Sequence, residues 1–334
     1  MTASSQRQGP LRAKHSFVWI ALLAIVSLDC VSLSFAQSTT QVHRTLATNA
    51  AQSLTLDVDV PNGDLQIVYG RDGQVSISGV AKASAGAKLD DSFFSNALNV
   101  EQAGNHLTIR HVQNAAYPEE GIKILYRIDV PYRTEVTSRL NHGNQTISGI
   151  MGPVRATTDK GDIKASYVSK GLQAEVDDGS LDLQVIGAHV EARTGRGNIS
   201  CARLEQGISA TTGDGDITLM VVGPSTATVK KGNGRIDVGG ARGSFVGSTD
   251  EGDLHVKAVP HDDWQLQSSS GNIRLELPPA TKFEIDASTI SGELQVDRDD
   301  IAKLTASDRK ITQTVNGGGK QIQVHTERGR IVIR

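Results

Sequence analysis

One phrase recurs along most of this chain: glycine, then a small polar or charged residue, then isoleucine or leucine. Between Gly161 and Gly292 its copies are 18 to 21 residues apart. They are Gly161-Asp162-Ile163, Gly179-Ser180-Leu181, Gly197-Asn198-Ile199, Gly215-Asp216-Ile217, Gly234-Arg235-Ile236, Gly252-Asp253-Leu254, Gly271-Asn272-Ile273 and Gly292-Glu293-Leu294. A regular period of this length is typical of architectures in which each repeat stacks on the next.

The series extends beyond these copies at both ends. Gly143 lies one period before Gly161, and Gly329-Arg330-Ile331 lies 37 residues after Gly292, which is about two periods. Arg309-Lys310-Ile311 occupies the missing position without its glycine. We therefore expect this segment to fill the slot between those last two copies.

Each repeat contains two short strands. Two residues after the isoleucine or leucine comes another small or aliphatic side chain, as in Leu183, Cys201 and Leu219, which is the alternation of a strand with one buried face. A second apolar pair precedes each glycine by seven and five residues, as in Val190 and Ala192. The glycine then lies at a corner, where the chain needs a positive φ. A phosphate-binding loop is not indicated, because a strand and not a helix follows the glycine.

Two arrangements suit a two-strand repeat: an antiparallel meander of hairpins, or a coil that wraps once per repeat. The coil is favoured because every repeat shows the same buried positions at the same phase. A narrow coil also explains why the chain has only 6 Phe, 5 Tyr and 2 Trp. We predict an all-β fold, a parallel right-handed β-helix (solenoid) with coils of about 18 residues and a small N-terminal cap.

Residues 1–36 have the pattern of a secretory signal peptide. Three basic residues precede an apolar run at residues 17–28, and a small–x–small sequence ends at Ala36. We predict cleavage near Ala36 and a secreted, periplasmic or cell-surface protein; retention of the segment as a membrane anchor is the alternative. Without it the chain has 31 basic and 36 acidic residues, a balance that argues against a nucleic-acid partner.

The remaining chain is divided into two regions of one continuous domain, at about residues 45–334. Residues 37–125 form a less regular, β-rich entry and cap region. Residues 126–334 carry the regular solenoid repeats.

The two ends of the solenoid differ in the sequence. The only plausible helix lies near residues 88–97, within a cap around residues 80–105 that would cover an open strand edge. No cap follows Ile331 and Ile333. We therefore expect those residues to lie near an end that is able to pair with a partner or with a second copy.

Three features together resemble the bacterial putative-adhesin family, a group of domains of unknown function. They are the entry phrase YRIDVPYRTEVTSRLNHGNQTISGIMGPVRATTDKGDI at residues 126–163, the signal peptide, and the series of GDI, GSL and GNI turns. The resemblance covers about residues 45–334. It implies a β-helix-like solenoid in the cell envelope or outside the cell, and it carries over no catalytic residues.

Adjacent carboxylates are the first candidates for catalysis, since polysaccharide lyases and hydrolases act through such groups. The pairs are Asp90-Asp91, Asp177-Asp178, Asp262-Asp263 and Asp299-Asp300. Neighbours on a strand point to opposite faces, and most of these pairs flank turns, so we interpret them as solvated turn residues and predict no enzyme activity.

Corner carboxylates could instead hold calcium, an ion that prefers oxygen ligands. The candidates are Asp162, Asp178, Asp214, Asp216, Asp250, Glu251 and Asp253. The calcium-binding nonapeptide of β-rolls is absent, and Arg235, Arg330 and Asn198 occupy equivalent positions. We predict no metal site.

Histidine and cysteine give no further site. The histidines at 43, 106, 111, 142, 189, 255, 261 and 325 have no ligand spacing. Cys201 falls in the predicted core row, where a thiol is inert. We predict no cofactor.

The leading hypothesis is a non-catalytic, secreted or envelope-associated β-solenoid that presents a repetitive face to a surface glycan or an envelope protein. Self-association through the solenoid ends is a further expectation. The alternatives are a carbohydrate-active β-helix enzyme and an envelope assembly or regulatory module.

Overall fold

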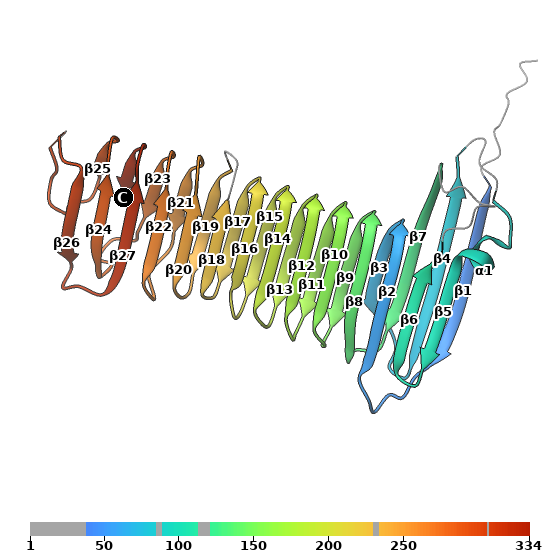
Figure 1. Ribbon diagram of the computed structural model, residues 1–334. Coiled ribbons are helices and arrows are strands. Elements are labelled where there is room, and N and C mark those ends of the chain that lie inside the picture. Colours follow the sequence, from blue (N-terminus) through green and yellow to red (C-terminus); the bar gives the residue numbers. More distant parts are fainter. Residues whose placement is uncertain (1–37, 85–88, 113–120, 230–233, 306) are drawn as a thin grey trace, which may run out of the picture. The chain divides into compact units, whose positions relative to one another are not determined.

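The computed structural model describes residues 38–84, 89–112, 121–229, 234–305 and 307–334. Residues 1–36 form a separate unit, and the predicted signal peptide lies outside the described residues. The described chain is all-β, with 28 strands, one short helix α1 (Phe93–Ala97) and two sheets of 14 strands each (Figure 1).

The two sheets take alternate strands of the chain through most of the array. In spatial order, sheet A contains β1 (Thr39–Ala47), β4 (Gln74–Ala83), β7 (Ile122–Val130), β3 (Asp64–Tyr69), β9 (Gln145–Ile150), β11 (Ile163–Val168), β13 (Leu181–Ile186), β15 (Ile199–Leu204), β17 (Ile217–Val222), β19 (Ile236–Ala241), β21 (Leu254–Lys257), β23 (Ile273–Glu276), β28 (Ile331–Ile333) and β25 (Leu294–Val296).

Sheet B follows the same stacking direction when it is read from its other end. It contains β5 (Leu98–Ala103), β6 (His106–His111), β2 (Leu54–Asn62), β8 (Thr134–His142), β10 (Val154–Lys160), β12 (Leu172–Asp178), β14 (Val190–Arg196), β16 (Ile208–Asp214), β18 (Ser225–Val229), β20 (Phe245–Thr249), β22 (Trp264–Ser268), β27 (Lys320–Thr326), β24 (Phe283–Thr289) and β26 (Lys310–Val315).

Equivalent residues of successive repeats pair directly, in parallel strands. Leu183 of β13 pairs with Cys201 of β15, which pairs with Leu219 of β17. All three side chains are buried, so they form one continuous column of the core. Parallel sheets of this kind confirm the predicted column and exclude an up-and-down meander of hairpins.

The corner glycines are required by close contact between coils as well as by conformation. Gly197 has φ +140, and a Cβ atom on it would lie 2.1 Å from the carbonyl oxygen of Gly179. A Cβ atom on Gly271 would lie 1.9 Å from the oxygen of Gly252, and no positive φ is recorded there. Absence of a side chain is therefore the requirement common to the series.

The threonines that precede these glycines by three residues bind the corner of the preceding coil. Thr194 Oγ1 donates to the carbonyl oxygen of Gly179 at 2.8 Å, and Thr212 Oγ1 donates to that of Gly197 at 3.0 Å. Both side chains are buried. Because a buried hydroxyl without a partner is costly, this bond explains a polar residue at the edge of the apolar column.

A second corner, near the end of each sheet A strand, has no clear signal in the sequence. Tyr167, Val185, Arg203 and Val221 have φ between 55 and 57, a conformation that costs a non-glycine residue about 1–2 kcal/mol. They are 18 residues apart, so the conformation belongs to the coil. Periodicity of hydrophobic residues does not reveal it, because these four side chains have little in common.

The N-terminal end departs from sequence order. The coil made by β2 and β3 lies between β6/β7 and β8/β9. Antiparallel strands β1 and β4 extend sheet A beyond β7, and β5 extends sheet B. The helix predicted near residues 88–97 is observed as α1 only at Phe93–Ala97, and residue 88 lies outside the described residues.

The C-terminal end shows the same rearrangement, and two expectations are wrong there. Ile331 pairs with Ile273 on one side and with Leu294 on the other. The last coil, β27/β28, is therefore inserted between β22/β23 and β24/β25, and Ile331 and Ile333 are fully buried. The segment Arg309-Lys310-Ile311 does not supply the missing coil, because β26 pairs antiparallel with β24 at the edge of sheet B.

Candidate functional site

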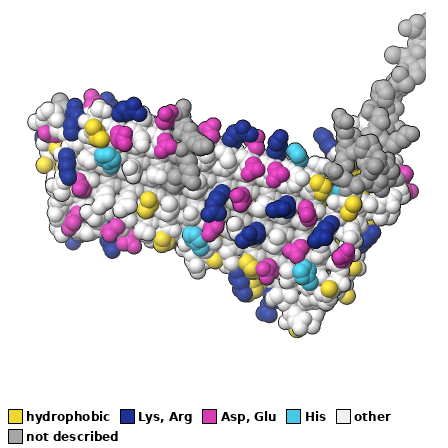
Figure 2. Space-filling model, in the orientation of Figure 1, with side chains coloured by type: hydrophobic (Ala, Val, Ile, Leu, Met, Phe, Trp, Pro, Cys, Tyr) yellow, Lys and Arg dark blue, Asp and Glu magenta, His cyan; other side chains and the backbone are white. Residues whose placement is uncertain are grey.

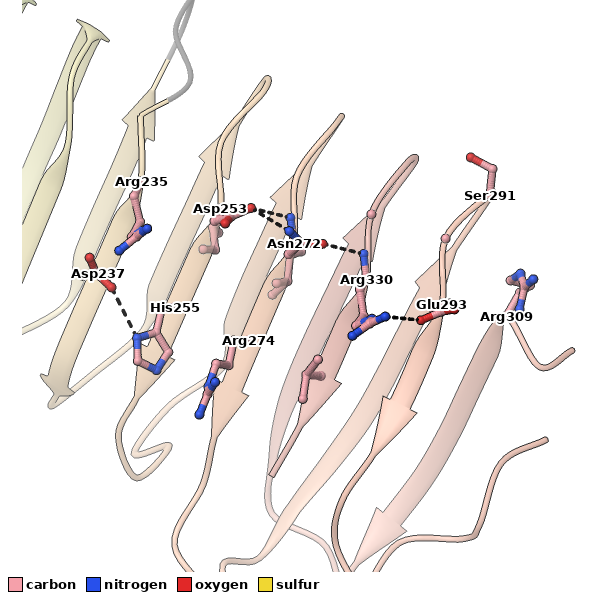
Figure 3. A pocket seen from close by; sticks show the side chains of 15 residues that line it. Arg235, Asp237, Asp253, His255, Asn272, Arg274, Ser291, Glu293, Arg309 and Arg330 are labelled. Carbon is pink, nitrogen blue, oxygen red and sulfur yellow. Dashed lines mark hydrogen bonds and ion pairs between the residues drawn. The ribbon is translucent and has the colours of Figure 1, made fainter. Parts of the chain in front are cut away.

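A depression of about 950 Å³ lies on the outer surface of sheet A (Figure 3). Its polar lining comes from β19, β21, β23, β28 and β25, and from the turns before them. The insertion of β28 makes this site, because it places Arg330 between Asn272 and Glu293, which are distant in the sequence.

The upper rim of the depression is a ladder of hydrogen bonds between corner residues. Asp253 Oδ1 accepts bonds from the backbone N–H and the side-chain Nδ2 of Asn272, at 2.8 and 3.1 Å. Asn272 Oδ1 accepts the backbone N–H of Arg330 at 3.0 Å. Both contacts are visible in Figure 3.

The same ladder runs through the rest of the stack and explains the small polar residue after each glycine. The side chain of one coil accepts the backbone N–H of the next: Asp64 to Asn144, Asn144 to Asp162, Asp162 to Ser180, Ser180 to Asn198, Asn198 to Asp216 and Asp216 to Arg235. An arginine has no acceptor atom. Arg235 therefore ends this run, and the ladder starts again at Asp253.

The arginines of the depression differ in their partners. Arg330 Nη2 forms an ion pair with Glu293 at 2.7 Å, and Arg274 Nη2 forms one with Glu276 at 2.5 Å. The exposed guanidinium of Arg235 forms no ion pair with any carboxylate of the described residues. It is the uncompensated positive charge of the site.

The opposite side of the depression holds a histidine between two carboxylates. His255 Nδ1 lies 3.3 Å from Asp237 Oδ1, and His255 Nε2 lies 3.4 Å from Glu276 Oε1. The hydrogen bond from Arg274 lowers the pKa of Glu276, and the charges of Arg274 and His255 lower it further. Glu276 therefore stays ionised and balances Arg274, which leaves Arg235 as the residue able to take an anion.

The predicted corner acids are not gathered into a metal site. Asp162, Asp216 and Asp253 use carboxylate oxygens as ladder acceptors, and Asp178 forms an ion pair with Arg196 at 2.8 Å. Across the described ranges there is no group of three or more His, Cys, Asp or Glu side chains with metal-binding geometry.

The four carboxylate pairs lie on separate parts of the stack, and each has a local partner. Asp90 accepts the backbone N–H and hydroxyl of Ser92, Asp178 pairs with Arg196, Asp262 with Lys320, and Asp300 with Arg298. Hydrogen bonds lower the pKa of Asp262, from the backbone N–H of Asp263 first, and that of Asp300, from Arg298 first. A general acid needs the opposite shift.

A second group of carboxylates lies near the C-terminal end. Asp297, Asp299 and Asp300 line a cavity of about 440 Å³. A hydrogen bond from Gln295 lowers the pKa of Asp297, with a further contribution from Arg334. Since neither Asp297 nor Asp300 is held in the protonated form, this cavity lacks the pair of opposed acid and base roles that glycoside hydrolysis uses.

Cys201 and the histidines have structural surroundings. Burial raises the pKa of the Cys201 thiol, with a smaller contribution from Asp182, so the thiolate that reacts is disfavoured. The described histidines are distributed along the stack. Examples are His106, which contacts Asp57 at 2.7 Å, and the buried His111, which contacts the hydroxyl of Tyr126.

Charges of both signs are interspersed on the surface. Figure 2 shows Lys and Arg side chains alternating with Asp and Glu over the face in view, without a large region of one sign. Recognition of a charged ligand would therefore depend on individual groups such as Arg235. No helix within the described residues has the length and hydropathy needed to cross a bilayer.

Comparison with protein families identifies the C-terminal half. Residues 172–334 match the family described as Toastrack DUF4097. The predicted resemblance to a family of putative adhesins with unknown function is confirmed. No match is found among curated proteins.

Solved structures with a similar strand arrangement have low sequence identity to this chain. A putative adhesin from Parabacteroides distasonis ATCC 8503 has 13% identity and a TM-score of 0.43, with 70% of this chain and 96% of that chain covered. A putative adhesin from Bacteroides fragilis NCTC 9343 has 9% identity and a TM-score of 0.36, with 88% and 95% covered. A putative cell adhesion protein from Clostridium sporogenes ATCC 15579 has 10% identity and a TM-score of 0.24, with 89% and 99% covered.

Proposed function

We propose, starting from a chain whose residues 172–334 carry a Toastrack DUF4097 domain, that this protein is a non-catalytic, envelope-associated binding protein. Its predicted signal peptide, cleaved near Ala36, would deliver it to the periplasm or the cell surface. Right-handed winding with about 18 residues per coil is part of the proposal. The ligand we assign to the depression on sheet A is an acidic glycan.

The observation that carries this assignment is the unpaired guanidinium of Arg235 beside the hydrogen-bonding groups of Asn272 and Arg330. A guanidinium binds a carboxylate through two parallel hydrogen bonds. Uronic acid residues of a polysaccharide present such a carboxylate together with hydroxyl groups, which match the amide and carboxylate groups of the rim.

The extent of the depression suits a chain and not a small molecule. Its lining comes from five neighbouring strands, β19, β21, β23, β28 and β25. Four strand spacings correspond to roughly 19 Å along the stack. Several sugar residues would therefore contact the surface at once, and weak contacts would add.

A non-catalytic role agrees with the state of the acidic groups. Asp253 accepts two hydrogen bonds from Asn272, Asp237 contacts His255, and Glu293 is paired with Arg330. Each carboxylate already has a structural partner.

The test is titration of polygalacturonic acid into the protein by isothermal calorimetry, with neutral dextran as the comparison ligand. Arg235→Ala should weaken binding of the acidic polymer about tenfold, which is the loss of roughly 1.4 kcal/mol expected for one charged contact. Arg235→Lys should recover only part of the affinity, because an ammonium group does not reproduce the two-pronged contact.

Arg155→Ala is the matched control, since Arg155 is also exposed but lies on sheet B, outside the depression. It should leave binding unchanged. Equal losses in the two alanine variants, or equal binding of dextran and polygalacturonic acid, would contradict the assignment. Cleavage of the polymer during the titration would contradict the non-catalytic role.

A further inference from the structure

The described chain exposes three tyrosines at one end of sheet A, far along the stack from the depression. Tyr69 is 49% exposed, Tyr132 is 43% exposed and Tyr167 is 62% exposed. By contrast, Tyr126 is buried and contacts His111. Rings that remain in water contribute little to the core, so a different reason for their position is needed.

Strand register places two of these rings in one row. Val68 pairs with Ser148, and Ser148 pairs with Ser166, so Tyr69, Gly149 and Tyr167 are equivalent residues of three successive coils. A Cβ atom on Gly149 would lie 2.9 Å from the Cβ of Tyr69, which confirms that the two residues are adjacent. The two tyrosines are thus two strand spacings apart, about 9.6 Å.

Gly149 leaves the space between the two rings free of a side chain. Tyr132 widens the platform, because its ring packs edge-to-face against Tyr69 with centroids 5.6 Å apart. The backbone N–H of Tyr132 donates to Asp72 at 3.0 Å, which fixes the turn that carries the ring. The result is one aromatic pair and one single ring with a gap between them.

The surroundings of the rings are polar but uncharged. The adjoining row contains Val68, Ser148 and Ser166, and the two serine hydroxyls are hydrogen-bonded at 2.9 Å. Charged residues make up 21% of the chain, yet the two rows carry none across these three coils. A charged ligand would find no counter-charge in them, whereas a hydroxyl-rich neutral ligand would find both donors and acceptors.

We propose that Tyr69, Tyr132 and Tyr167 form a second binding site, which stacks against the rings of an uncharged, β-linked hexose chain. The face of a pyranose ring is made of C–H groups, which are attracted to the negative face of an aromatic ring. In an extended β-linked chain, every second sugar presents the same face at a spacing close to that of the two tyrosines. The sugar between them lies over Gly149 and reaches the serine hydroxyls.

The left-handed conformation of Tyr167 orients its ring away from the core. Its φ is 56, and Val185 has the same conformation in the next coil. The conformation is therefore a property of the coil, while the aromatic ring at that position is specific to Tyr167. This site is independent of the depression, so either can fail without the other.

The test is titration of cellohexaose, a neutral β-1,4-linked hexasaccharide, with maltohexaose as an α-linked comparison. Tyr69→Ala and Tyr167→Ala should each weaken cellohexaose binding at least about fivefold, the scale of one aromatic contact. Tyr167→Phe should stay within about twofold of the unaltered protein, because the stacking face is kept.

Two controls separate this site from general effects. Met220→Ala removes another exposed apolar side chain of sheet A and should not change binding, and Arg235→Ala should not change it either. Absence of cellohexaose binding, equal binding of maltohexaose, or a Tyr167→Phe variant as weak as Tyr167→Ala would overturn the proposal. Thermal unfolding of each variant shows whether a loss reflects the site or the fold.

Discussion

The middle of the stack and its C-terminal end are built from the same repeat but differ in how the coils are ordered. From β8 to β23, each coil lies beside its neighbours in the sequence. At the C-terminal end, β27/β28 enters between β22/β23 and β24/β25 (Figure 1). The repeat therefore determines the shape of a coil, whereas the order of coils depends on which edges are still open when a segment docks.

This difference has a functional consequence. In the middle of the stack, corner residues mainly bind each other through the ladder. At the end, insertion of β28 brings Arg330 between Asn272 and Glu293 and completes the depression. The irregular end, and not the regular middle, provides the candidate site.

The largest effect should come from a side chain placed in the glycine column of the middle region. Gly197→Ala would put a Cβ atom 2.1 Å from the carbonyl oxygen of Gly179, at a residue with φ +140. We expect a loss of about 3–5 kcal/mol in the free energy of unfolding, measured with urea. Gly104→Ala is the control, because φ there is +63 but no atom lies within 4 Å, and it should cost only about 1 kcal/mol.

The next effect compares the two regions directly. Ile199 lies in the middle of the stack and Ile331 in the inserted coil, and both are buried. Because Ile331 is covered by β23 and β25, substitution of either residue by alanine should cost a similar 2–5 kcal/mol, about the value for a core cavity. A loss for Ile331→Ala below about a third of that for Ile199→Ala would indicate a frayed last coil.

A smaller effect is expected from the ladder. Asn198 Oδ1 accepts the backbone N–H of Asp216 at 2.9 Å, so Asn198→Ala should cost about 1 kcal/mol in urea unfolding. Arg235 provides no acceptor at the equivalent position, and Arg235→Ala should cost less than about 0.5 kcal/mol. Equal losses would show that the ladder does not contribute as described.

The smallest effect is a pH dependence at the C-terminal end. The hydrogen bond from Arg298 lowers the pKa of Asp300 below its ordinary value of 3.8. The stability from this pair is present above that ordinary value and is lost as the pH falls through the lower, folded-state pKa. Asp300→Asn should therefore lose less stability than the unaltered protein on acidification below about pH 4, whereas Asp159→Asn, an exposed change on β10, should behave like the unaltered protein.

The core of a single coil could be predicted from the sequence, because burial of alternate residues repeats with the glycine. The column of Leu183, Cys201 and Leu219 is the clearest case. The second corner, at residues such as Val185, could not be predicted, since its left-handed conformation is imposed by closure of the coil and no special residue type marks it.

The candidate site was less accessible to sequence reasoning. Arg330 and Asn272 are 58 residues apart, and an array in sequence order would not bring them into contact. The positions of Arg309 and Lys310 in the periodic count even favoured the wrong order. The ladder was also missed, although the small polar residue after each glycine was its signal.

Cross-linking of engineered cysteines tests the inserted coil, on which the depression depends. Arg274 pairs with Val332, and Val332 pairs with Gln295. Arg274 and Gln295 are then two strand spacings apart, about 9.6 Å, beyond the roughly 7 Å between Cα atoms that a disulfide can bridge. Under mild oxidation, mass spectrometry should find a disulfide in the Arg274→Cys/Val332→Cys protein and none in the Arg274→Cys/Gln295→Cys protein. The reverse result would place β25 beside β23 and contradict the inserted coil.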